Sequence, residues 1–140
     1  MGSKFDPLLG QLRTTDSVAV NYSSILSTTT GINGKTVANT AIYTVPSGKT
    51  AVIMAYVVRV SSASAITVGP AAGIGNIAGT DNISASQAMN LLTSTTSTFQ
   101  WTVNGMSVIS SSGSTIYFNL DTAAIGTSET LTIDLWGYLI

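Results

Sequence analysis

The longest apolar run of the chain covers residues 50–60 and limits the folds open to it. The run reads Thr-Ala-Val-Ile-Met-Ala-Tyr-Val-Val-Arg-Val, and its β-branched residues favour a strand over a helix. A nearly continuous apolar strand is typical of a position buried on both faces, because a strand with one wet face alternates with polar residues. We therefore expect residues 50–60 to be the central strand of a β-structured core.

Shorter segments with alternating apolar and polar residues predict the other strands. Ile66 and Val68 predict one short strand, and the apolar residues among 89–92 mark a further short element. Segments 27–35 and 69–79 are rich in small and hydroxyl residues, which predicts loops. The remaining expected strands lie near residues 17–23, 40–45, 99–103, 106–110, 116–120 and 130–140.

Turn signals indicate how these strands are joined. Pro46-Ser47-Gly48 is typical of a tight turn and predicts a hairpin between residues 40–45 and 50–60. Asn104-Gly105 is a two-residue hairpin signal, so we expect the following strand to return antiparallel to residues 99–103. About eight short strands with regularly spaced turns predict an all-β fold, an antiparallel jelly-roll-like sandwich over residues 17–140.

Residues 1–16 differ from the rest and predict a separate N-terminal attachment arm. Within the arm, residues 5–13 predict a short helix, because Asp6 can cap its free amides and Pro7 suits the first helical position. So short a helix does not persist alone in water, and its apolar face needs a surface to dock on. That surface is the chain's own domain, a neighbouring subunit or a larger assembly. The residues nominated for attachment are Phe5, Pro7, Leu8, Leu9 and Leu12.

Composition excludes several classes of protein chemistry. The chain has no histidine and no cysteine, which removes histidine-based triads, thiolate nucleophiles and metal sites built from these residues. Its net charge of −1 offers no basic surface for nucleic acid. The long uncharged stretches are too polar to predict a membrane-spanning helix. Lys4, Asp6 and Arg13 interrupt the apolar segment that a signal peptide would need.

Only 8% of the residues are charged, and the charges are unevenly placed. The 19 serines and 21 threonines can cover a surface without charge, which explains how such a chain can stay in solution. From Val60 to Leu120 the sole charged residue is Asp81. Two interpretations remain open for this region. It is a subunit interface, since interface cores are depleted in charge, or it is a surface coated with hydroxyl groups.

One glycine motif and the acidic residues are the candidates for a nucleotide-binding, catalytic or metal site. Residues 73–78 match the dinucleotide pattern G-x-G-x-x-A, but no acidic residue follows at the spacing that a ribose contact needs, so we expect a loop instead. Asp121 and Glu129 bracket a short loop and are the one candidate carboxylate pair for glycoside hydrolysis, while Asp134 points to the opposite face of the last strand from Ile133 and Leu135. No segment offers enough oxygen ligands to predict calcium binding. We expect no enzyme activity, cofactor or metal.

Aromatic residues are the remaining candidates for ligand contact. Trp101 shares a face with Phe99 and Val103, which places it in the core. Trp136 and Tyr138 share the polar face of the last strand with Thr132 and are expected to be partly exposed, either as a subunit contact or as a sugar platform. The subunit contact is the favoured interpretation.

Three segments together resemble small β-structured virion proteins of tailed bacteriophages, namely capsid decoration (cement) proteins and related fibre tips. These segments are KFDPLLGQLR at residues 4–13, YTVPSGKTA at residues 43–51, and the last two strands, from GSTIY at 113–117 to TLTIDLWGYL at 130–139. The resemblance implies a non-enzymatic structural protein, a homotrimer on the capsid surface, that binds the major capsid protein or other virion subunits and stabilises the shell. Fibre proteins usually carry a repetitive shaft, and this sequence shows no repeat, which favours decoration of the head. The alternative is a carbohydrate-binding receptor domain of a tail fibre or adhesin.

Overall fold

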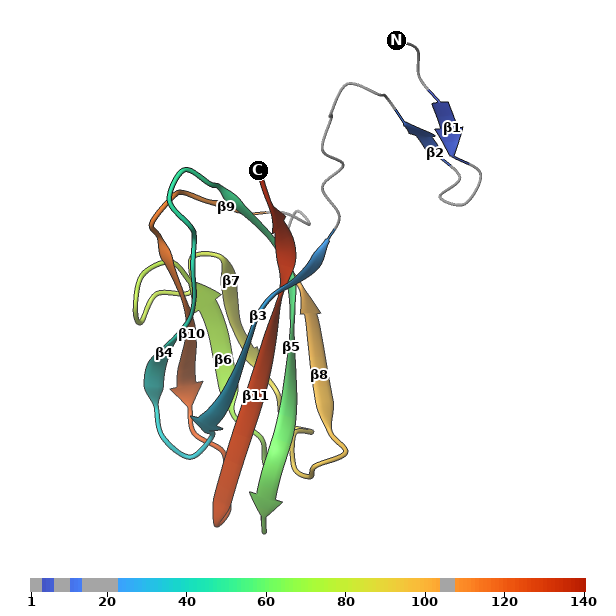
Figure 1. Cartoon of the computed structure of the whole chain (residues 1–140). Coiled ribbons are helices and arrows are strands. Elements are labelled where there is room, and N and C mark those ends of the chain that lie inside the picture. The colour runs from blue at the N-terminus through green and yellow to red at the C-terminus, as the bar shows by residue number, and fades with distance from the viewer. Residues whose placement is uncertain (1–3, 7–10, 14–22, 104–107) are drawn as a thin grey trace.

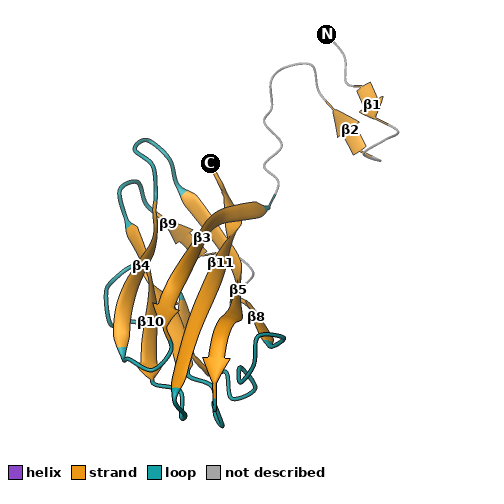
Figure 2. Ribbon diagram, turned by 60° about the horizontal axis from the view of Figure 1, so that its bottom comes forward, coloured by secondary structure: helices purple, strands orange, loops and turns teal. Residues whose placement is uncertain are grey.

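The computed structural model of the chain describes residues 4–6, 11–13, 23–103 and 108–140, and these contain strands and loops but no helix (Figure 1). Two antiparallel sheets lie face to face (Figure 2). One has the order β3 (Ser24–Asn33), β11 (Ser128–Leu139), β5 (Ala51–Ser64) and β8 (Thr98–Thr102), and β9 (Val108–Ser110) also pairs with β5. The other has the order β4 (Ala38–Thr44), β10 (Thr115–Thr122), β6 (Ala71–Gly75) and β7 (Ser84–Ala88). The expected all-β antiparallel sandwich is confirmed, with nine strands where about eight were expected.

The core lies between the sheets and follows from the alternation of the sequence. On β10, Ile116, Phe118 and Leu120 point inward and are buried, as the period of two predicts. On β11, Leu131, Ile133 and Leu135 are buried in the same way. The inward residues of β5, the strand next to β11 in the same sheet, also belong to the core; they are Ala51, Ile53, Tyr56, Val58 and Val60.

Strand β5 is central, as predicted, but only its first residues, Ala51 to Ile53, are buried on both faces. It pairs with β11 on one side and with β8 and β9 on the other. Its inward residues contact the opposite sheet, whereas Met54, Ala55 and Val57 are only partly buried and Arg59 is exposed. The run is apolar on its outer face because that face lines a groove, which is described below.

Two segments expected as loops are strands instead. Residues 27–35 fall mostly in β3, an edge strand in which β-branched threonines suit the extended backbone. Its hydrophobic alternation is hidden because the register against β11 shifts twice, once close to Gly31, which has a φ of 74°. Such bulges break the period of two that sequence patterns depend on.

Residues 69–79 were also expected as a loop, but five of them, residues 71–75, form β6. The glycines of the G-x-G pattern serve close packing rather than a phosphate. A Cβ at Gly73 would lie 2.2 Å from Asp81 Cγ, and one at Gly75 would lie 1.7 Å from the carbonyl oxygen of Thr80. The small residues therefore let the β6–β7 loop lie directly on the outer face of the four-stranded sheet.

The two predicted hairpins are wrong. Lys49 N donates to Pro46 O, so the turn exists, but it carries the chain from β4 in one sheet to β5 in the other. Asn104 and Gly105 lie outside the described residues, and β9 pairs with β5, not with β8. A further turn, at residues 111–114, is closed by Ser114 N, which donates to Ser111 O.

The N-terminal segment departs from the predicted helix. Its described residues are two short antiparallel strands, β1 (Lys4–Asp6) and β2 (Gln11–Arg13), with Phe5 opposite Leu12. A helix of two turns makes few intrahelical hydrogen bonds, so a hairpin of similar length competes easily with it. Residues 7–10 lie outside the described residues, as do residues 17–22 of the strand expected at 17–23. Among the residues that are described, no helix is long and apolar enough to cross a membrane.

We predict that Gly75→Ala destabilises the sandwich. The added Cβ collides with the backbone oxygen of Thr80, so the β6–β7 loop must move away from the sheet. The expected loss is about 1–3 kcal/mol in the free energy of unfolding, measured by chemical denaturation. Ala85→Val, on the exposed face of the neighbouring β7, is the control and changes stability by less than about 0.5 kcal/mol. Equal stability of Gly75→Ala and the wild type would contradict this packing role.

Candidate functional site on the outer sheet face

The outer face of the five-stranded sheet carries Trp136 on the interior strand β11. In the strand register, Trp136 on β11 is opposite Ile25 on β3 and Ala55 on β5, and Ala55 is opposite Thr102 on β8. Residues directly opposite each other on neighbouring strands project from the same face. A row of four side chains therefore crosses the outer face, and its end residue Ile25 is 46% exposed.

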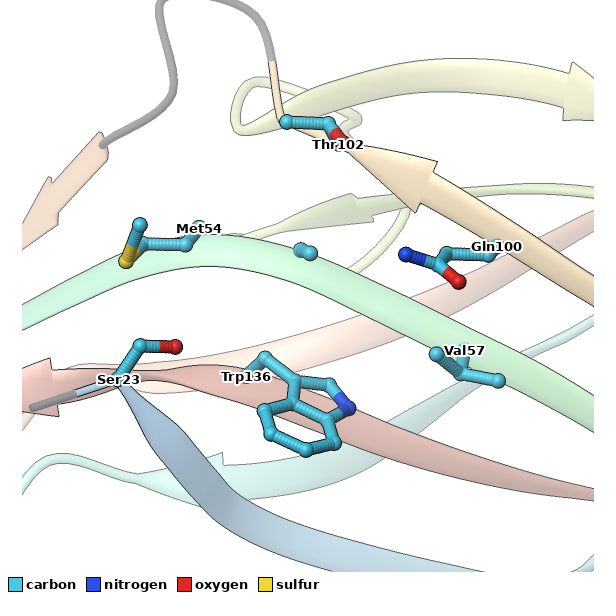
Figure 3. Close-up of a pocket in the computed structure, with 7 residues that line it drawn as sticks. Ser23, Met54, Val57, Gln100, Thr102 and Trp136 are labelled. Carbon is cyan, nitrogen blue, oxygen red and sulfur yellow. The ribbon is translucent and has the colours of Figure 1, made fainter.

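Beside Trp136 lies a groove of about 330 Å³ (Figure 3). In the figure the indole ring lies flat against the sheet, and the Ser23 hydroxyl and the Gln100 amide point toward each other across the groove. No charged side chain is among its described lining residues, which are Ser23, Met54, Ala55, Val57, Gln100, Thr102 and Trp136. The groove thus combines an apolar floor with neutral hydrogen-bonding groups at its rim.

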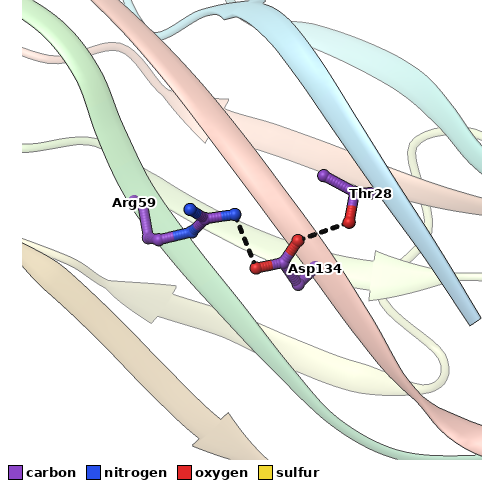
Figure 4. Close-up of polar contacts among 3 residues, drawn as sticks. All are labelled: Thr28, Arg59 and Asp134. Carbon is purple, nitrogen blue, oxygen red and sulfur yellow. Dashed lines mark hydrogen bonds and ion pairs between the residues drawn. The ribbon is translucent and has the colours of Figure 1, made fainter. Parts of the chain in front are cut away.

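A polar cluster lies on the same face (Figure 4), and its central residue Asp134 is opposite the groove residue Val57. Asp134 on β11 accepts a hydrogen bond from Thr28 Oγ1 on β3 at 2.7 Å, and an ion pair joins its other oxygen to Arg59 Nη2 on β5 at 2.7 Å. The cluster ties three adjacent strands together. Asp134 does point away from the core, as predicted, and its charge is satisfied by these partners.

Of the two residues nominated on β11, only Trp136 lines the groove. Tyr138 is opposite Val52 on β5 and is partly buried, outside the described lining of the groove. In the arm, Phe5 and Leu12 belong to β1 and β2, whereas Pro7, Leu8 and Leu9 lie outside the described residues. The assignment of these five residues to attachment stays a prediction.

Trp101 packs against the core, as expected, but it is not fully buried. Its ring stacks on that of Phe99 with centroids 6.0 Å apart and planes 5° apart. Both rings are on β8, which pairs with β5 alone in the described part of the sheet, and both remain partly exposed. Sequence reasoning placed Trp101 on the inner face correctly but could not show that its strand is an edge.

The candidate acid pair is arranged differently from the prediction. Asp121 lies close enough to Asp81 that its carboxyl helps to raise the Asp81 pKa, although burial is the main cause of that rise. Asn119 Nδ2 donates to Asp81 Oδ1 at 3.0 Å and acts in the opposite direction. Asp81 was missed because it meets Asp121 only after the β6–β7 loop folds over the sheet. Within the described ranges, no group of three acidic residues is placed to hold a metal ion.

Glu129, the second residue of the predicted acid pair, is buried. It is 3% exposed, and neither of its carboxylate oxygens has a hydrogen-bond partner among the described residues. Its side chain packs so closely on Gly34 that a Cβ there would lie 2.1 Å from Oε2. Burial raises the pKa of Glu129 to about 7, even though the positive charge of Lys35 lowers it.

We predict that Glu129 makes the stability of the protein depend on pH. Its pKa is 4.5 ordinarily and about 7 in the folded chain, so the folded state holds a proton that the unfolded state has lost between these values. Stability therefore falls as pH rises from 4.5 to 7 and then levels off. Glu129→Gln mimics the protonated form and is expected to be more stable than the wild type at pH 8 by about 1–2 kcal/mol.

Denaturant unfolding at pH 5 and pH 8 measures this difference. The chain has no histidine, so few other groups titrate in this range. A wild type equally stable at both values, or a Glu129→Gln variant with the same slope as the wild type, would show that the carboxyl is not the titrating group.

Comparison of the chain with protein families, with curated proteins and with solved structures finds no match.

Proposed function

We propose that the chain is a non-enzymatic structural protein of a virion, a capsid decoration protein that binds the head shell as an oligomer. The observation that carries the proposal is a set of large aliphatic side chains left exposed on a sandwich whose core is already complete. Partner subunits that cover these side chains would gain apolar contact area. The exposed side chains are Ile25, Val37, Ile77, Leu91, Ile109, Ile125 and Ile140.

The distribution of charge supports the same proposal. None of the edge strands β3, β4, β7, β8 and β9 contains a charged residue or a proline. Natural sheets usually protect exposed edges with such residues to prevent association. Edges without this protection suit a protein that functions inside an assembly.

The proposed partners are the major capsid protein or other virion subunits at the capsid surface. The N-terminal segment, residues 1–16, is the proposed attachment element, and the sandwich is the proposed jelly-roll-like body, since most of its connections cross between the two sheets. No cofactor, nucleic acid or membrane enters this proposal.

Deletion of residues 1–14 is expected to weaken binding to expanded capsids at least about tenfold, or 1.4 kcal/mol. The loss follows if Phe5, Leu8, Leu9 and Leu12 contribute buried apolar area to the contact. Co-sedimentation of purified protein with expanded capsids of the encoding virus measures it.

The control for this experiment is a chain with residues 5–12 in scrambled order. It has the same length and composition, and it is expected to bind as weakly as the deletion. If the wild type fails to bind expanded capsids, the decoration function is wrong. If the deletion binds as well as the wild type, the attachment role of the segment is wrong.

The Trp136 groove favours a second candidate function, carbohydrate recognition by a fibre or adhesin domain. A flat indole beside neutral amide and hydroxyl groups is chemically suited to a sugar ring, whose faces are apolar and whose rim is polar.

A glycan array with the wild type tests this candidate. Specific binding that falls at least about tenfold in Trp136→Ala and largely persists in Trp136→Phe, which keeps an aromatic face, would establish it in place of decoration. Absence of glycan binding by the wild type, or equal binding by Trp136→Ala, would remove it.

A further inference from the structure

Strand β8 is an edge of the five-stranded sheet with a free side. In the described part of the chain it pairs with β5 alone, from Thr98 opposite Arg59 to Thr102 opposite Ala55, without a register shift. In Figure 1 no strand lies beyond it on that side. It is thus a regular edge, in contrast to β3 and β4, whose pairings contain bulges. A regular edge can accept another strand without rearrangement.

The flanking hydrogen bonds show which backbone groups of β8 are directed outward. Val103 N donates to Met54 O, and Ser97 O accepts from Val60 N. The odd-numbered residues at both ends of β8 therefore direct their backbone N–H and C=O groups toward β5. Backbone groups alternate in direction along a strand. The N–H and C=O groups of Thr98, Gln100 and Thr102 therefore point to the free side.

The sequence of β8 is chemically palindromic about Gln100. It reads Thr-Phe-Gln-Trp-Thr, so an antiparallel copy centred on Gln100 places threonine opposite threonine and Phe99 opposite Trp101. Aromatic pairs and threonine pairs are both favourable across strands. On the axis, Gln100 meets its own copy, and an amide can both donate to and accept from another amide. A charged residue at this position would repel its copy.

The residues around β8 are also apolar and uncharged enough to form a contact surface. Leu91 is 87% exposed and lines, together with Thr98 and Phe99, a hollow of about 320 Å³ beside the strand. The chain has no charged residue between Asp81 and Asp121, a stretch that contains β7, β8 and β9. A second copy at this edge would cover Leu91 and the exposed parts of both aromatic rings without burying any charge from this stretch.

We propose that two copies of the chain associate through β8, antiparallel across a two-fold axis at Gln100, to form one continuous sheet. The pairing exchanges backbone hydrogen bonds at Gln100 and at both Thr98–Thr102 pairs. A strand that complements itself produces a two-fold contact, whereas a trimer needs two different complementary surfaces. The geometry of β8 therefore favours a dimer over the trimer that the phage resemblance implies.

The experiment measures the mass of the purified protein by light scattering or sedimentation over a range of concentrations. The wild type is expected to dimerise. Gln100→Lys and Gln100→Glu each place like charges together on the axis, and each is expected to be monomeric at concentrations where the wild type is dimeric. An equimolar mixture of the two is expected to form dimers again, because the charges are then opposite.

Recovery of dimers in the mixture shows that both variants are folded, and thermal unfolding of each checks this independently. Thr30→Lys, on the opposite edge strand β3, is the matched control and is expected to remain dimeric. A monomeric or trimeric wild type, dimers of Gln100→Lys alone, or a mixture that stays monomeric would overturn the proposal. Because the dimer is measured on the free protein, its failure is distinct from a failure to bind capsids.

Discussion

The antiparallel pairing of β5 with β11 is the interaction on which the rest of the structure depends. It runs from Ser64 opposite Ser128 to Ala51 opposite Leu139 and joins the two interior strands of the larger sheet. Their inward side chains form one wall of the core, and burial of that wall against the smaller sheet provides the main driving force for folding. Their outward side chains include four of the residues that line the Trp136 groove, and they form the Arg59–Asp134 pair. One strand pair thus determines stability on one face and the candidate site on the other.

The few charged residues of the chain occupy particular positions in the fold. Arg59 and Asp134 neutralise each other on the outer face, and Glu129 is buried where burial favours its neutral form. Asp81 lies over a sheet whose glycines make room for it. Within the two sheets of the sandwich and their connections, the charges are thus located at interior strands, turns and one covering loop, while the edges remain neutral. In a chain that is 8% charged, this placement leaves whole sides of the sandwich without electrostatic protection.

The sequence was sufficient for the features that depend on a regular period of two. It placed β10 and β11 and the inward faces of both, because their alternation is unbroken over the buried residues. It failed at β3, where bulges disrupt the period, and at β6, where glycines required by loop packing look like a loop signal. Of the Trp136 groove, the sequence predicted only the partial exposure of the indole ring. The other wall of the groove comes from β5 and β8, and only the register brings those side chains together.

The wrong hairpin prediction has the most consequence for function. Had the strand after Asn104-Gly105 returned beside β8, it would have covered the free edge of the sheet. Instead, β9 occupies the next positions along β5, opposite Ala51 to Ile53, and continues the line of β8. The outward backbone groups of Thr98, Gln100 and Thr102 consequently keep no partner strand among the described residues. The placement of β9 that extends the pairing of β5 also leaves a neutral, self-complementary strand at the surface, which is the requirement for association between copies.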